Sequence, residues 1–291
     1  MLEKLSKNLA KNCIYIIWVI VYFSIAWYIL GADWNSFFLV FVLYGISILI
    51  ALSPVGEALL RFIEKVRPIS TNEEKEYLLP LFEEVYENAK QKDIKLNDNI
   101  KLYIIDNMYV NAFAIGRKTI AVTMGAIHTF SQDELKGIIA HEFGHLSNGD
   151  TKALLLSTIG NGIFSILICI LKIVLLITDL IFSFISIPLL NIFTRIASFL
   201  FDMGVILFSY ISQILLSVNS RQNELWADRF AFDIGYGEEL VSSLYILQKI
   251  SLPHNLSILD RLRASHPNTA KRIEQLENLL STQDEEVFIT P

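Results

Sequence analysis

The pentapeptide His141-Glu142-Phe143-Gly144-His145 is the segment of this sequence whose residue types and spacing best suit chemistry. On a helix, residues i and i+4 lie on one face, so both imidazoles can reach one metal ion. Glu142 lies beside them and can take a proton from metal-bound water, whose pKa zinc lowers to about 7. The pattern predicts a hydrolytic zinc site. The competing interpretation, a polar patch on an ordinary helix, requires a chance match in a chain with only five histidines.

A third metal ligand is required, because catalytic zinc usually has three protein ligands and keeps one position for water. Glu224, in the segment Ser220–Asp228, is the candidate, and Asp228 follows it at i+4 on the same face of a predicted helix. Asp228 is then placed to accept the outer N–H of a ligand histidine and to fix its tautomer. Taken alone, either carboxylate is more often a solvated surface residue. Only the pairing with the histidine motif singles them out.

The histidine motif needs a rigid element, and the flanking residues predict a helix. Ser131 and Glu134 form a capping-box pattern at its start, and Gly149 suits its end. A similar pattern at Thr71–Glu74 predicts an earlier helix that runs to about Gln91.

Three short β-branched segments lie between these two helices and predict strands: Lys101–Asp106, Val110–Ile115 and Thr119–Thr123. The polar portion of the chain is therefore expected to be an α+β domain with a small β-sheet.

The composition indicates a membrane protein. Hydrophobic residues make up 53% of the 291 residues and charged residues only 19%, below the usual quarter. A net charge of −6 argues against a nucleic-acid partner, which normally calls for a basic surplus. Cys13 and Cys169 lie in apolar runs and show neither metal-type spacing nor a disulfide framework.

Two apolar runs near the N-terminus, Ile14–Leu30 and Phe37–Leu52, predict an antiparallel pair of membrane spans. A signal peptide is the alternative for the first run. The second run follows after a very short turn and no small-residue cleavage site is present, so two spans are the simpler interpretation.

A second apolar stretch, about residues 154–218, is too long for one span and is interrupted by Lys172, Asp179, Pro188 and Arg195. We expect a span near residues 154–171, an amphipathic or re-entrant piece over 173–194, and another span near 196–217. The fold class expected is thus an α-helical integral membrane protein with about four spans and a cytoplasmic α+β catalytic domain with a small β-sheet. Its segments are residues 1–56 (N-terminal membrane hairpin), 57–150 (catalytic segment with the histidine motif), 151–218 (second membrane hairpin) and 219–291 (catalytic segment with the third zinc ligand).

The positive-inside rule predicts the orientation. Three lysines precede the first span and Arg61, Lys65 and Arg67 follow the second, whereas the turn between them carries only Asp33. Both termini and the two catalytic segments are therefore expected in the cytoplasm. A metal shared by His145 and Glu224 also requires an even number of crossings between them, which two spans satisfy.

Four segments in order resemble the HtpX-like family of membrane zinc metalloproteases, which belong to the gluzincin clan and are relatives of the CaaX prenyl proteases. They are NAFAIG at Asn111–Gly116, AHEFGHLSNGD at Ala140–Asp150, SRQNELWAD at Ser220–Asp228 and SHPNTAKRI at Ser265–Ile273. The chain departs from the family at Leu225, where tyrosine is common, and at Asn223, where a basic residue is frequent; neither is a metal ligand.

The resemblance implies a role for each matching position. One Zn²⁺ per chain would be bound by His141, His145 and Glu224, with Glu142 as the base. Other matching positions imply His266 as the oxyanion donor, Asp228 and Arg272 as supports of the site, and Asn111, Ala112, Phe113 and Ala114 as the edge strand that binds substrate backbone. An edge strand can hold varied sequences through main-chain hydrogen bonds; an ordinary edge strand is an equal alternative.

The expected activity is that of a zinc metalloendopeptidase in a prokaryotic plasma membrane. Its substrates would be misfolded or damaged membrane proteins, cleaved on the cytoplasmic side as quality control. Three alternatives remain at this point: a protease with its zinc inside the bilayer, a prenyl-protein CaaX protease, and a non-catalytic membrane scaffold with a residual metal site. The sequence does not predict the oligomeric state.

Overall fold

The structure, a computed structural model, describes residue 17 and residues 19–94, 96–156, 162–185, 188–250 and 269–289. These residues form two compact units, divided near residues 50, 157 and 219. We call residues up to 50 together with 158–219 the helical unit. Residues 51–157 together with those from 220 onward are the mixed unit.

The helical unit contains apolar helices. A helix covers Val19–Ile29, and α2 (Trp34–Leu52), α8 (Gly162–Phe184) and the first part of α9 (Pro188–Asp233) follow. In the described residues, two stretches are long and apolar enough to cross a membrane, Trp34–Leu52 and Leu189–Ile206. The expected first hairpin has its turn at Gly31 and Ala32, both at positive φ.

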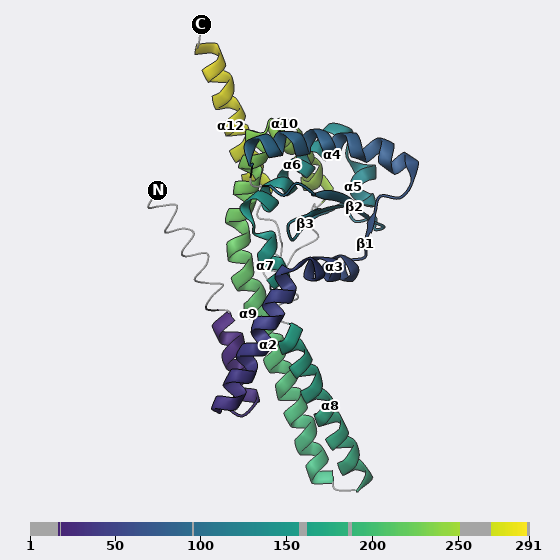
Figure 1. Cartoon of the computed structure of the whole chain (residues 1–291), viewed down its shortest axis with the longest axis vertical. Coiled ribbons are helices and arrows are strands. Elements are labelled where there is room, and N and C mark those ends of the chain that lie inside the picture. The colour runs from purple at the N-terminus through teal and green to yellow at the C-terminus, as the bar shows by residue number, and fades with distance from the viewer. Residues whose placement is uncertain are drawn as a thin grey trace. The chain divides into compact units, whose positions relative to one another are not determined.

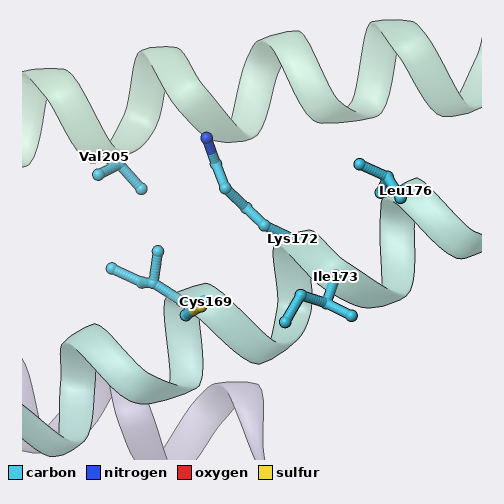
Figure 2. A pocket seen from close by; sticks show the side chains of 6 residues that line it. Cys169, Lys172, Ile173, Leu176 and Val205 are labelled. Atoms are coloured by element: carbon cyan, nitrogen blue, oxygen red, sulfur yellow. The ribbon is translucent and has the colours of Figure 1, made fainter.

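The second hairpin corrects the sequence prediction. We expected a separate amphipathic or re-entrant piece over 173–194, but α8 continues as one helix through Lys172 and Asp179 to Phe184, and α9 begins at Pro188. The charged residues that interrupt the apolar pattern are partners across the hairpin. Lys172 forms an ion pair with Asp202, and Figure 2 shows its side chain extending from α8 toward α9 between apolar residues.

The mixed unit contains a four-stranded sheet in the order β1-β2-β4-β3, with strands β1 (Val66–Pro68), β2 (Lys101–Ile105), β3 (Ala112–Ile115) and β4 (Thr119–Thr123). β2 and β4 are parallel and the other pairs are antiparallel. Three of the strands were predicted from the sequence. The short β1 was not, because it has only three residues and contains a proline.

The mixed unit also contains the helices α3 (Pro54–Ile63), α4 (Asn72–Lys92), α5 (Met124–Thr129), α6 (Gln132–Asn148), α7 (Thr151–Leu155), the end of α9, α10 (Gly237–Ile250) and α12 (Thr269–Ile289). In Figure 1, α4, α6 and α10 lie on one side of the sheet and α3 on the other. Both predicted capping boxes are present, at the starts of α4 and α6.

The core of the mixed unit is built around α6. Phe143, on this helix, is fully buried and its ring stacks on Phe82 and Tyr86 of α4, with centroids 5.5 Å apart in both pairs. Leu135 and Ile139 of α6 are also fully buried. Such packing fixes both the position and the rotation of the helix, so its opposite face can hold polar side chains in defined places.

Candidate metal centre

Three side chains from two helices converge in the mixed unit. His141 and His145 come from α6 and Glu224 from α9, and their ligand atoms all lie within 4.8 Å of one another. The two Nε2 atoms are 3.1 Å apart, and the Glu224 carboxylate oxygens lie 3.3 Å from Nε2 of His141 and 3.4 Å from Nε2 of His145.

These distances fit a zinc ion. Zinc binds histidine nitrogen and carboxylate oxygen at about 2.0–2.2 Å in tetrahedral geometry, which puts neighbouring ligand atoms about 3.3–3.5 Å apart. In the structure the two Nε2 atoms are 3.1 Å apart, and each has one of the two Glu224 oxygens close by, Oε2 at 3.3 Å from His141 and Oε1 at 3.4 Å from His145. The donor set, two imidazoles and one carboxylate, is also one that catalytic zinc uses.

A close contact between helix backbones sets this geometry. Gly144 of α6 faces Ala227 of α9, and a Cβ added to Gly144 would lie 2.7 Å from the Ala227 Cα. Only glycine permits that approach. Since Gly144 precedes His145 and Ala227 is one turn from Glu224, the contact places the ligand-bearing faces of the two helices together.

Asp228 and Arg272 support one side of the centre. Asp228 Oδ1 lies 2.9 Å from His141 Nδ1, where it can accept the outer N–H and leave Nε2 as a ligand atom. Arg272, from α12, donates to both carboxylate oxygens of Asp228 at 2.6 and 2.7 Å, and its Nη1 lies 3.1 Å from Glu224. All of these side chains are buried.

Asp150 supports the other side, and the sequence analysis gave it no role. Its Oδ2 lies 3.0 Å from His145 Nδ1 and also accepts a hydrogen bond from the Asn148 side chain. Asn148 donates in turn to Asn223 of α9 at 3.2 Å. Each histidine therefore has its own carboxylate on the outer nitrogen, and a hydrogen-bonded chain links the end of α6 to α9.

The centre carries excess negative charge. Burial lowers the pKa of His145, but Asp150, Glu224 and Glu142 outweigh burial and raise this pKa to about 11. Burial raises the pKa of Asp228, yet Arg272 and His141 bring it below its ordinary value. Four buried or half-buried carboxylates thus surround one guanidinium, a field that favours a bound cation.

Glu142, the predicted base, is 3% exposed and follows His141 directly on α6. The predicted oxyanion donor His266 lies outside the described residues.

The predicted substrate strand lies at the sheet edge. Ala112, Phe113 and Ala114 belong to β3, which pairs with β4 on one side and with no other strand in the described residues. Asn111 precedes β3 and exchanges hydrogen bonds with Thr123, since its N–H donates to the Thr123 hydroxyl and its carbonyl accepts from it. β3 contacts α6, the helix that carries the histidines.

Known proteins resemble this chain in sequence and fold. The family model for Peptidase family M48 matches residues 73–280. Protease HtpX of Psychrobacter sp. (strain PRwf-1) is 29% identical over 220 residues, covering 68% of this chain and 69% of that protein. Protease HtpX homolog of Pyrococcus abyssi is 42% identical over 72 residues, 23% of this chain and 25% of that protein.

Among solved structures, the crystal structure of S. mikatae Ste24p matches with a TM-score of 0.51 and 20% identity, and the match covers 95% of this chain and 67% of that one. At that identity the match concerns the fold alone.

Proposed function

This chain belongs to peptidase family M48, and we propose that it is a zinc-dependent membrane endopeptidase of the HtpX type. The observation that carries the proposal is the convergence of the His141, His145 and Glu224 ligand atoms to within 4.8 Å of one another, with Glu142 next to His141 in the chain. These residues would hold one Zn²⁺, which, when bound, polarises the scissile carbonyl and acidifies water.

The chain's own residues supply the proton transfers. Glu142 accepts a proton from the attacking water and returns it to the leaving amine. Asp228 and Asp150 hold the two histidines in the tautomer that leaves Nε2 free for the metal. His266 is proposed as the donor that stabilises the oxyanion, a role worth about 3 kcal/mol in other hydrolases.

Substrate binding is proposed along β3. An extended peptide can add, through main-chain hydrogen bonds, to the edge of β3 that pairs with no other strand in the described part of the chain, and such bonds tolerate many sequences. Phe113 is half-buried on β3, whereas Ala112 and Ala114 are buried. Recognition by backbone suits a protease that acts on unfolded segments.

The proposed biological role is quality control of membrane proteins. About four spans would anchor the chain in a prokaryotic plasma membrane, with both termini and the mixed unit in the cytoplasm. Support comes from the basic residues that flank the first hairpin and from the two stretches able to cross a membrane.

Glu142→Gln tests the proposal. In lipid nanodiscs with zinc, the wild type should cleave an unfolded protein. Glu142→Gln should still bind zinc stoichiometrically, but its cleavage rate should be lower by a factor of about 10³ or more. The matched control is Asp133→Asn, an exposed carboxylate on the same helix, which should cleave like the wild type. A chelator should abolish cleavage and zinc should restore it.

Equal cleavage by Glu142→Gln would refute the assigned base. A zinc-loaded wild type that cleaves neither unfolded nor membrane-embedded protein would favour a scaffold with a residual metal site. Cleavage confined to a prenylated C-terminal peptide would favour a CaaX protease.

A further inference from the structure

Helix α3 has two faces of opposite character. It begins at Pro54, two residues after α2 ends at Leu52, and Ser53 caps it by accepting a hydrogen bond from the Val55 N–H. The residues buried against the mixed unit are Gly56, Glu57 and Leu60. The exposed apolar residues are Val55, Leu59, Phe62 and Ile63.

The exposed apolar residues form a continuous stripe. Their spacing, i, i+4, i+7 and i+8, puts them on one side of the helix. Phe62 is 81% exposed and Val55 65% exposed, large values for apolar side chains gathered on one short helix. Contiguous exposed apolar surface of this kind marks a binding face.

Lipid is the occupant that the chain itself indicates. The stripe begins three residues after the end of a helix that is long and apolar enough to cross a membrane. A short amphipathic helix that follows such a segment can lie in the interface with its apolar side among the acyl chains. Lys65, exposed just after the helix, can extend its amine to the headgroups.

The buried face of α3 holds the turn between β3 and β4. Glu57 accepts hydrogen bonds from the Thr119 hydroxyl at 2.7 Å, from the Arg117 backbone N–H at 3.2 Å and from Arg61 at 3.2 Å. Arg61 also donates to the Thr119 hydroxyl at 2.9 Å. Gly116, at φ +61°, lies so close that an added Cβ would be 2.5 Å from the Glu57 carboxylate.

This carboxylate is therefore hydrogen-bonded to the turn that follows the edge strand and to the first residue of β4. β3 ends at Ile115, one residue before Gly116, whose carbonyl accepts a hydrogen bond from the Thr151 hydroxyl of α7. A displacement of α3 would therefore move this turn and, with it, Ile115 of β3, which pairs with Thr119.

We propose that α3 lies in the membrane–water interface, with the stripe Val55, Leu59, Phe62 and Ile63 in lipid, and thereby holds β3 where it meets polypeptide segments that leave the bilayer. The placement of β3 near the bilayer rests on the proposed function, in which β3 binds substrate backbone.

A depth measurement tests the lipid contact without using proteolysis. In a Cys13→Ser, Cys169→Ser background, Phe62→Cys and the control Ile94→Cys each carry a nitroxide in phosphatidylcholine–phosphatidylglycerol nanodiscs. Ile94 is matched because it is apolar, 88% exposed and in the mixed unit. We expect oxygen to reach the label at position 62 and a water-soluble nickel chelate to be excluded from it by about tenfold relative to position 94.

Equal access of the nickel chelate to both labels would overturn the proposal. Protection at position 62 accompanied by spin–spin broadening would also overturn it, because a second copy of the chain would then cover the stripe.

Cleavage assays test whether the lipid contact of α3 places β3 for substrates at the bilayer. Phe62→Ser should raise the KM for a bilayer-anchored peptide by about tenfold and leave cleavage of a soluble unfolded protein unchanged, whereas Ile94→Ser should change neither. Equal effects of Phe62→Ser on both substrates would refute the placement of β3 by lipid contact. If no variant cleaves anything, the proposed function has failed and the nitroxide measurement still decides the position of α3.

Discussion

Replacing Gly144 by alanine should weaken zinc binding strongly and should lower the stability of the apo protein only slightly. The added Cβ would lie 2.7 Å from the Ala227 Cα and 3.0 Å from the Ala227 Cβ and carbonyl oxygen. Ordinary contact begins near 3.4 Å. No side-chain rotation relieves the overlap, because all three atoms belong to the backbone or are fixed to it. Helices α6 and α9 must therefore separate by about 0.7 Å.

The consequence for the metal follows from the ligand spacing. Glu224 lies one turn before Ala227, so the separation lengthens its 3.3 and 3.4 Å distances to the two histidines toward about 4 Å. Zinc sites tolerate deviations of about 0.2 Å in bond length. A misplacement approaching 1 Å typically costs about 10²-fold in activity, and we expect zinc affinity to fall by a similar factor.

Stability should change less. Overpacking costs about 1–3 kcal/mol, and alanine is better than glycine in a helix by about 1 kcal/mol, so the net loss is about 0–2 kcal/mol. Zinc affinity from chelator competition and the Tm of the apo protein separate the two effects. The control is Gly204→Ala on α9, whose Cβ would have nothing within 4 Å; it should keep zinc affinity and a similar or higher Tm. If Gly144→Ala kept full zinc affinity and turnover, the backbone contact would not set the ligand spacing.

Two further substitutions probe the charges. Arg272→Met leaves the buried Asp228 carboxylate without its guanidinium and should destabilise the protein by about 3–5 kcal/mol in denaturant unfolding; an unchanged midpoint would contradict the role of this pair. The hydrogen bond from Arg67, with bonds from two backbone N–H groups, lowers the pKa of Glu74 to about 2, so its stabilisation is present above the unfolded value near 4.3 and is lost as the pH falls through 2. Glu74→Gln should therefore reduce stability at pH 7 by about 1 kcal/mol, seen as a lower Tm, and should leave the Tm unchanged well below pH 2. A difference in Tm that is independent of pH would refute this.

The sequence predicts those features of the metal centre that depend on the local spacing of residues. His141 and His145 share a face because they are four residues apart on one helix, and the capping residues predicted where that helix begins and ends. Glu224 and Asp228 share a face for the same reason. Arg272 was reached only through the resemblance, because its pairing with Asp228 spans 44 residues and no local pattern encodes it.

The second apolar hairpin was divided wrongly for a physical reason. A charge within an apolar run was treated as the end of a membrane segment, because an isolated charge is costly in lipid. Lys172 and Asp179 are not isolated: one pairs with Asp202, and the other accepts a hydrogen bond from Thr194 at 2.8 Å. The partners lie 30 and 15 residues further along the chain, on the antiparallel helix. Only the hairpin reveals which charges compensate each other.

Asp150 shows how a correct local prediction can still miss a contact. Gly149 was expected to end α6, and it does so in the left-handed conformation, with φ 73° and ψ 15°. A residue at i+5 on a continued helix would point away from His145. Because the glycine reverses the chain, Asp150 instead returns to within 3.0 Å of His145 Nδ1. An acidic residue directly after a glycine cap, one turn beyond a ligand histidine, is therefore a signal for the carboxylate that orients that histidine.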